Sequence, residues 1–349
     1  MADHPSSAGA PRLASLGRAV PGSRYTQEEL YRHRPWEATA LTDRLFLASP
    51  VQTRALFVPP DFYATPRTLT ETNDAWREGA LALAGRALLE ALERADRSVE
   101  EVDVLGVTTV TGTTTPGLDL RLAQAHGLRR DVQRLHFNNI GCHAAVPLLR
   151  SVADHVRARP GSLGVAIAVE VCSACFAPRD DPQNLVAVSL FADGAACAVL
   201  AADAPGPAFV DVESIFELDH LDALGFDLEA TGFRIVLDPA IPGLVAAGIT
   251  RAVDTLLARH DLDRSDVAAW CLHPGGSRVL DAAQRSLGLT DAQMQPSRRV
   301  LRNYGNMSSP SVLFVLAEAL GEAPVEAGAP IVLAAFGPGV GVEAALLRA

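Results

Sequence analysis

A cysteine stands where a strand-like run meets a helix-like run. Cys142 lies within Asn138–Val146, after the β-like run Leu135–Phe137 and before a helix-like run, Val146–Arg159. This spacing predicts Cys142 at the N-terminus of the helix, where the helix dipole and free backbone N–H groups stabilise a thiolate. A thiolate is the form of cysteine that attacks carbonyl carbons. The alternative is a small buried cysteine that only packs.

A histidine and an asparagine in the second half of the chain are the candidate partners of this thiol. His273 ends a buried strand-like run and precedes Pro274-Gly275-Gly276, a turn that lets the backbone approach another group closely. Asn306 follows Tyr304-Gly305. Together the two side chains would form an oxyanion hole for a thioester or enolate oxygen, and a His273 imidazolium would also hold the thiolate as an ion pair. The alternatives are a histidine that caps the next helix and an ordinary turn asparagine.

Internal duplication brings these residues together. Three segments of the second half resemble three of the first, in the same order: 265–272 and 101–108, 303–309 and 139–145, 331–347 and 190–200. The pattern predicts an α/β protein of two duplicated halves, 1–205 and 206–349, each a mixed sheet sandwiched by helices. Equivalent loops of a duplicated fold lie near its pseudo-twofold axis, so we expect Asn306 beside Cys142.

Hydrophobic periodicity predicts the elements that carry these motifs. Strands are expected at 13–20, 102–109, 163–171, 186–190, 195–201 and 209–216, and helices at 75–97, 118–126, 277–287 and 312–320. Thr26 is the expected cap of a short helix. Residues 41–72 are expected to be irregular, and residues 1–11 a mobile tail.

Composition excludes several classes of function. The 349 residues carry a formal net charge of −11 and no Lys/Arg run, which argues against a nucleic-acid partner. Five cysteines form no disulfide framework, and the pair Cys172 and Cys175 has no second pair to complete a zinc site, so we expect no metal. Neither a secretory signal nor an uninterrupted apolar run of membrane-spanning length is recognisable. We therefore expect a cytoplasmic protein without a membrane partner.

Four motifs resemble the chalcone synthase superfamily, the type III polyketide synthases of the thiolase fold. They are Gly-Cys at 141–142, His-Pro-Gly-Gly at 273–276, Tyr-Gly-Asn-Met-Ser-Ser at 304–309 and Phe-Gly-Pro-Gly at 336–339. The resemblance implies that Cys142 takes the acyl group of a starter acyl-CoA. His273 and Asn306 would stabilise the thioester oxygen and the enolate formed when malonyl-CoA loses CO2. Extension and cyclisation would follow, in a homodimer that needs CoA thioesters as substrates and no other cofactor.

The same resemblance implies a set of residues around the substrate. Phe191 and Phe233 match two phenylalanines between the CoA tunnel and the cavity, although core packing is the default for any Phe. Ser308 matches a cavity serine, with helix capping as the alternative, and Arg44 is a candidate for the CoA entrance. Cys175 and Val110 stand where plant members carry cavity threonines, and Cys172 is a further candidate pocket thiol. Gly337, Pro338 and Gly339 form the cavity loop.

Departures from the family pattern bear on the product rather than on the class. His143 follows the nucleophile where plant members have another residue. It would either tune the Cys142 region electrostatically or point away into a helix–helix contact, and we expect the latter. Ala335 replaces the first glycine of the cavity loop. Two rival functions are a ketoacyl synthase III-like enzyme that performs a single condensation and a non-catalytic thiolase-fold protein that binds CoA esters. The starter unit, the number of extensions and the cyclisation mode cannot be predicted from the sequence.

Overall fold

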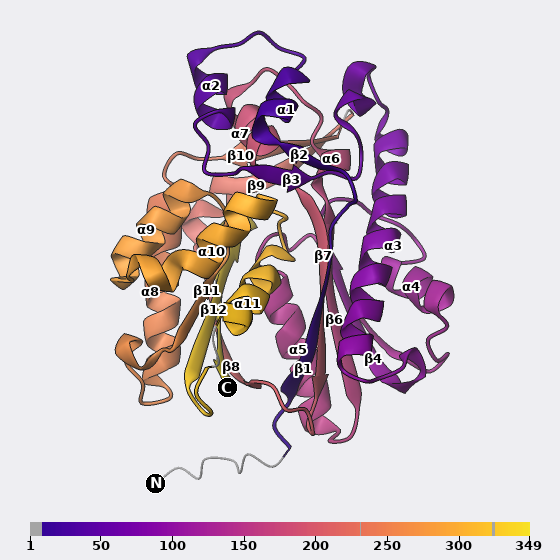
Figure 1. Cartoon of the computed structure of the whole chain (residues 1–349), viewed down its shortest axis with the longest axis vertical. Helices are drawn as coiled ribbons and strands as arrows, with labels where there is room; N and C mark the ends of the chain where they lie inside the picture. Colours follow the sequence, from indigo (N-terminus) through magenta and orange to yellow (C-terminus); the bar gives the residue numbers. More distant parts are fainter. Residues whose placement is uncertain (1–8, 231, 323–324) are drawn as a thin grey trace.

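Nine strands form one mixed sheet that runs through the whole molecule (Figure 1). The computed structural model describes residues 9–230, 232–322 and 325–349, so most of the expected N-terminal tail and Thr231 lie outside the described residues. The strand order is β11-β12-β13-β8-β1-β7-β6-β4-β5. The strands are β1 (Arg12–Ala19), β4 (Val102–Thr109), β5 (Gln133–Asn138), β6 (Leu163–Val171), β7 (Asp193–Ala201), β8 (Ala208–Phe216), β11 (Ala269–Leu272), β12 (Pro330–Gly337) and β13 (Gly341–Arg348).

The two ends of this sheet repeat the same arrangement. β1 pairs antiparallel with β7, β7 antiparallel with β6, and β6 parallel with β4. In the second half, β8 pairs antiparallel with β13, β13 antiparallel with β12, and β12 parallel with β11. A single pair, Arg12 with Ala208, joins β1 to β8. The duplicated α/β architecture is therefore confirmed, while the division at residues 205/206 stays a prediction.

Helices cover both faces of the sheet and fill the space between its halves (Figure 1). α5 and α11 lie in the centre and pack against strands of both halves in one apolar core. α3 covers the outer face of the first half, and α8 that of the second. The longer helices are α3 (Leu69–Arg94), α4 (Leu118–His126), α5 (Ala145–Ala158), α8 (Ile241–Ala258), α9 (Ser277–Leu287), α10 (Asp291–Tyr304) and α11 (Ser311–Glu322).

The central position of α5 and α11 follows from their sequences. Both are rich in Ala, Val and Leu, and most of their apolar residues are buried. Because each helix begins beside one of the candidate motifs, the core fixes where those motifs lie. α8 is long and apolar enough, by length and composition, to cross a membrane. Its apolar residues, however, pack in the core against β13, which is the placement of a core helix.

Shorter elements surround the end of the sheet that carries the motifs. Two small antiparallel sheets, β2 with β3 and β9 with β10, lie at the upper end of the view in Figure 1, near α1, α2 and α7. These elements are β2 (Arg24–Thr26), α1 (Gln27–Arg32), α2 (Ala40–Phe46), β3 (Thr53–Ala55), α6 (Cys172–Cys175), α7 (Pro182–Leu190), β9 (Leu224–Glu229) and β10 (Gly232–Leu237). Five 3₁₀ turns lie among the described residues: η1 (Pro60–Ala64), η2 (Val99–Glu101), η3 (Leu218–Ala223), η4 (Arg264–Asp266) and η5 (Pro338–Val340).

Three expectations about local structure are wrong. Residues 41–72 are not irregular, because they contain most of α2, all of β3 and the start of α3. α3 begins at Leu69 rather than at residue 75, because Thr68 and Glu71 form a capping box. Residues 186–190, expected as a strand, lie in α7, which Asp181 caps by accepting a hydrogen bond from the Asn184 N–H.

Candidate active site

The structure places Cys142 in the turn between β5 and α5. Gly141 has a φ of +91°, and a Cβ there would lie 2.4 Å from Pro338. Only glycine therefore lets the turn pass so close to the cavity loop. Cys142 follows, 7% exposed, and α5 begins at Ala145. The predicted position of the thiol before a helix N-terminus is confirmed.

Asn306 lies in a matching turn, between α10 and α11. Its backbone N–H donates to Leu190 O (2.9 Å), and its carbonyl accepts from the Ala192 N–H (2.9 Å). Its side-chain Oδ1 accepts from the Ser308 N–H (2.8 Å). Among the described residues, no partner is recorded for the Nδ2 donor. The amide is therefore fixed through its acceptor and its backbone, with its donor left for a ligand.

His273 follows the last residue of β11. Its backbone N–H donates to Ala334 O (2.8 Å) on the neighbouring strand. The ring is 1% exposed and stands edge-on to the Phe336 ring, with centroids 5.1 Å apart. Neither ring nitrogen has a hydrogen-bond partner among the described residues. A buried imidazole with two unpaired nitrogens is costly, which is typical of a group that meets its partner in a ligand.

One cavity of about 840 Å³ brings Cys142, His273 and Asn306 together. Phe191 and Pro338 also line it, and Arg44 and Arg278 are two of its basic lining residues. Cys142 Sγ lies 3.3 Å from Ser308 Oγ. The convergence that the internal repeat predicts is thus present in the structure.

Burial dominates the electrostatics of this cavity. It raises the pKa of the Cys142 thiol to about 12, against a smaller lowering by the Ser308 hydrogen bond. It lowers the pKa of His273 to about 3, with a further lowering from nearby His143. Each group is therefore neutral at pH 7 in this structure. Burial disfavours both charges of the ion pair expected from the sequence, and no hydrogen bond among the described residues joins the two side chains.

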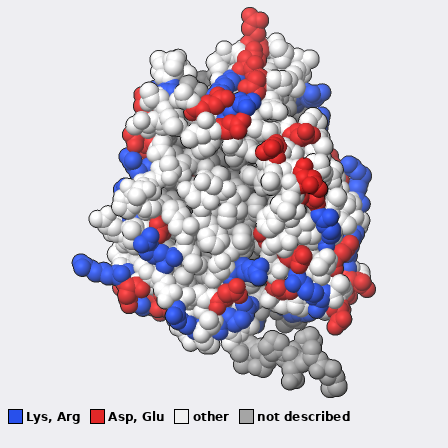
Figure 2. Space-filling view, turned by 180° about the vertical axis from the view of Figure 1, so that it is seen from behind, with Lys and Arg blue, Asp and Glu red and all other residues white. Residues whose placement is uncertain are grey.

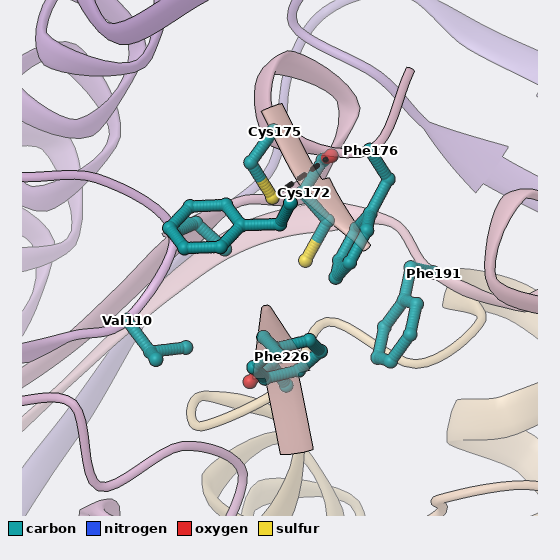
Figure 3. A pocket seen from close by; sticks show the side chains of 9 residues that line it. Val110, Cys172, Cys175, Phe176, Phe191 and Phe226 are labelled. Atoms are coloured by element: carbon teal, nitrogen blue, oxygen red, sulfur yellow. Dashed lines mark hydrogen bonds between the residues drawn. The ribbon is translucent and has the colours of Figure 1, made fainter. Parts of the chain in front are cut away.

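A second, much smaller space shares the lining residues Phe191 and Phe226 with the large cavity. Figure 3 shows this chamber from close by. Val110, Cys172, Cys175, Phe176, Phe191 and Phe226 surround it, together with Thr111, Phe233 and Ser308. Its volume is about 10 Å³, roughly that of one water molecule. The expected cavity residues Val110, Cys175, Phe233 and Ser308 line this chamber rather than the large cavity, and Phe191 lines both.

Of the three cavity-loop residues expected to line the large cavity, one does so. Pro338 lines the large cavity, whereas Gly337 and Gly339 are not among the residues that line it. Gly339 has a φ of +70°. A Cβ at Gly337 would lie 2.3 Å from His143 Nδ1, so the His143 ring packs against this loop. His143 is therefore not in the expected helix–helix contact.

Sequence reasoning missed two buried charges near the site. Glu170 on β6 accepts from the Val110 N–H (2.9 Å), the Thr111 N–H (3.1 Å) and Ser309 Oγ (2.6 Å), and its pKa is raised by burial to about 6. A carboxylate inside an apolar strand is a visible signal. Arg54 on β3 is also buried, within the stretch expected to be irregular. No local sequence pattern identifies Phe176 and Phe226 as lining residues of the chamber.

Comparison with known proteins identifies the family. The family model "Chalcone and stilbene synthases, N-terminal domain" matches residues 59–204, and the corresponding C-terminal domain model matches residues 218–349. The chain is 35% identical to 1,3,6,8-tetrahydroxynaphthalene synthase of Streptomyces peucetius subsp. caesius, over 96% of this chain and 92% of that protein. It is 33% identical to 3,5-dihydroxyphenylacetyl-CoA synthase of Streptomyces toyocaensis, over 97% and 90%.

Comparison with solved structures leads to the same family. The crystal structure of 1,3,6,8-tetrahydroxynaphthalene synthase from Streptomyces coelicolor A3(2), a bacterial type III polyketide synthase, matches with a TM-score of 0.90. That match is 28% identical and covers 97% of this chain and 99% of the other. These relatives favour the polyketide synthase interpretation over the ketoacyl synthase III-like and non-catalytic alternatives. The chain therefore belongs to the chalcone and stilbene synthase family and is a type III polyketide synthase, an acyltransferase that condenses malonyl-CoA units.

Proposed function

We propose that Cys142 carries the growing acyl chain and that His273 and Asn306 stabilise the oxyanions. The observation that carries this proposal is their convergence: all three are buried, and all three line the same cavity. A thiol, an imidazole with two free nitrogens and an amide with a free donor are what acyl transfer requires there.

The loading step needs a proton acceptor for the thiol. Since burial disfavours an isolated thiolate and an isolated imidazolium, we propose that His273 takes the Cys142 proton as the sulfur attacks the starter thioester. The attack forms the new C–S bond, and the bond from the acyl carbon to the CoA sulfur breaks. The proton on His273 then passes to the departing CoA thiolate, so no net charge stays in the cavity.

The condensing step needs oxyanion donors rather than a strong base. As the malonyl carboxylate leaves as CO2, its bonding electrons form an enolate whose oxygen lies at the Asn306 Nδ2 donor and an N–H of His273. The enolate carbon attacks the Cys142 thioester, and the Cys142 sulfur leaves as a thiolate. Chain transfer back to Cys142 permits the next extension, and cyclisation releases the product.

CoA thioesters are the only ligands that this proposal requires. Arg44 and Arg278 line the cavity and are suited to the phosphates of CoA. We propose no further cofactor and no metal. Residues 1–205 and 206–349 would form the two halves, a division supported by the family models, which match 59–204 and 218–349.

A homodimer is the proposed assembly. Figure 2 shows a broad, hollowed face whose middle carries few charged side chains, while charges gather around its margin. Large apolar side chains are also exposed near η3, among them Phe216, Leu218, Leu221 and Leu228. Uncharged and apolar surface of this kind is typical of a face that is covered in solution. The formal charge of −11 argues against a nucleic-acid partner, and we propose a cytoplasmic enzyme without a membrane partner.

Replacement of the nucleophile tests the function. The protein is incubated with malonyl-CoA alone and with acetyl, long-chain acyl or aromatic acyl-CoA, and products are identified by mass. Cys142→Ala should abolish every malonyl-CoA-dependent product, whereas Cys197→Ala, a change at a buried free cysteine that lines neither cavity, should retain product formation. Turnover by Cys142→Ala would show that the nucleophile is assigned wrongly.

A further inference from the structure

A buried guanidinium lies behind the site. Arg54 is 2% exposed and comes from β3, far from the three candidate catalytic residues in sequence. Burying a guanidinium is costly unless its donors are paired, and the loss of one partner is strongly destabilising. Its position therefore depends on the groups that it binds, and those groups depend on it.

Arg54 binds the segment that carries Phe191. Its Nη1 donates to Phe191 O (2.7 Å), and its Nε donates to Gln27 Oε1 (2.9 Å). Gln27, itself buried, donates from Nε2 to Ser189 O (2.8 Å). Arg54 and Gln27 thus bind the backbone carbonyls of Phe191 and Ser189, which belong to the same turn.

The same segment holds Asn306. The Asn306 N–H donates to Leu190 O, and the Ala192 N–H donates to Asn306 O, both at 2.9 Å. The stem of Arg54 also packs against the residue before Asn306, since a Cβ on Gly305 would lie 2.9 Å from Arg54 Cγ and Cδ. Arg54 therefore contacts both backbone segments whose hydrogen bonds set the position of the Asn306 amide.

The guanidinium stays charged. Burial lowers its pKa to about 9, while nearby Asp193 favours the charged form. At pH 7 it therefore donates charge-assisted hydrogen bonds, which are about twice as strong as neutral ones. Arg54 also lines an outer pocket of about 90 Å³, on whose wall Phe176 and Phe191 lie, with ring centroids 5.0 Å apart. Arg54 thus adjoins space that a small solute can enter.

We propose that Arg54, with Gln27, is a positioning residue for the condensing step: it fixes the Ser189–Ala192 segment, and through it the Phe191 wall and the Asn306 amide. The inference rests on the proposed role of Asn306 as an oxyanion donor. Loss of Arg54 should impair malonyl-CoA decarboxylation and extension, which need the amide. Acylation of Cys142 should be retained, because the recorded hydrogen bonds of Arg54 reach neither Cys142 nor His273.

The variants Arg54→Met, Arg54→Lys and Gln27→Leu test the proposal against Arg24→Met. Arg24 is a matched control, because it lies on the paired strand β2 and donates to Asn303 O (2.7 Å), but not to the Phe191 segment. For each variant, CO2 release from malonyl-CoA, acylation of Cys142 by peptide mass and the thermal midpoint are measured. Arg54→Met should lower kcat for decarboxylation at least about tenfold. Its KM and Cys142 acylation should stay within about twofold of the unmodified protein.

Rescue separates positioning from folding. Arg54→Lys should retain part of the activity, and added guanidinium should restore activity to Arg54→Ala through the outer pocket. If Arg54→Met does not fold, Gln27→Leu takes its place as the test of the proposal. Gln27→Leu should lower the rate of malonyl-CoA decarboxylation and leave Cys142 acylation intact. Unchanged decarboxylation in the folded variants, or equal losses of acylation and decarboxylation, would overturn the proposal.

A parallel variant distinguishes this inference from the proposed function. If Asn306→Ala loses decarboxylation and Arg54→Met keeps it, the Arg54 inference is wrong and the role of Asn306 stands. If Asn306→Ala retains decarboxylation activity, Asn306 is not the oxyanion donor. The proposal that Arg54 acts by positioning the Asn306 amide is then overturned as well.

Discussion

Cys142 and Asn306 occupy matching turns, yet the protein holds them very differently. Each follows a glycine of positive φ, +91° at Gly141 and +72° at Gly305, and each precedes a central buried helix. Asn306 is fixed by two backbone hydrogen bonds to the neighbouring segment and by one from the Ser308 N–H to its side chain. Among the described residues, the Cys142 side chain has one polar contact, to Ser308 Oγ at 3.3 Å.

The difference matches the two tasks. An oxyanion donor works by being in place before charge develops, so rigid support helps it. A nucleophilic sulfur must attack, carry a chain and leave, and few hydrogen bonds leave its lone pairs free. Ser308 links the two turns, since its N–H supports the amide and its hydroxyl contacts the thiol. The duplicated fold thus carries a thiol with few hydrogen bonds on one side and an amide fixed by several hydrogen bonds on the other.

The largest effect is expected from removing the fixed donor. Asn306→Ala should lower malonyl-CoA decarboxylation by about 10²–10³-fold, the usual loss for one oxyanion-hole donor. CO2 release measures this directly. Asn303→Ala is the control, because only the backbone carbonyl of Asn303 is recorded as a hydrogen-bond partner, of Arg24 and Thr53. Equal rates in the two variants would show that the amide is not part of the site.

The burial of Cys142 predicts that the rate of its alkylation depends steeply on pH. Because burial raises the pKa of Cys142 to about 12, the thiol is protonated throughout the neutral range and its reactive fraction grows with pH. The rate of Cys142 alkylation by iodoacetamide should rise about tenfold per pH unit between pH 6 and 9. Peptide mass spectrometry follows the modified cysteine. A plateau below pH 7 would instead indicate a resting thiolate–imidazolium pair.

Rigidity of the Asn306 turn can be tested at its glycine. In Gly305→Ala the new Cβ would lie 2.8 Å from Leu190 O, at a φ of +72°. The free energy of unfolding should fall by about 1–3 kcal/mol, as measured by urea denaturation. Gly243→Ala, at a site where a Cβ meets no atom within 4 Å, should be neutral or stabilising. A neutral Gly305→Ala would mean that the turn is adaptable.

The smallest effect on activity is expected from replacing Ser308, which contacts both Cys142 and Asn306. Ser308→Ala removes the hydroxyl that lowers the pKa of Cys142, so alkylation at pH 8 should slow by less than about tenfold. The backbone N–H that supports Asn306 remains, and decarboxylation should therefore change little. Ser309→Ala is the comparison, since that hydroxyl donates to Glu170 instead. A loss of decarboxylation as large as that of Asn306→Ala would contradict the division of roles.

The scaffold and the location of the site could be predicted from the sequence. Strands 102–109 and 163–171 and helices 118–126 and 277–287 have the predicted bounds, because long apolar runs and clear turns mark them. The internal repeat alone is enough to predict that Asn306 lies opposite Cys142. The α7 helix could not be predicted from its short apolar run, because residues 186–190 fit either a strand or a helix. Asp181 and Pro182 are the local signal that favours the helix.

Other features depend on contacts between distant segments. Val110, Cys175 and Phe233 come from three separate elements, and only their packing against Phe176 and Phe226 leaves a chamber of about 10 Å³. Likewise, no local pattern shows that Arg54 on β3 binds the Phe191 carbonyl. Such relations follow from tertiary packing, which periodicity does not encode.

The central claim is that Cys142 carries the acyl chain, and the direct measurement is the mass of the acylated enzyme. The protein is exposed briefly to a starter acyl-CoA, quenched in acid and digested, and every cysteine peptide is weighed. The account predicts the acyl mass on the peptide that contains Cys142 and on no other. Acylation of the Cys172 and Cys175 peptide, or product formation without any acyl-cysteine, would contradict it.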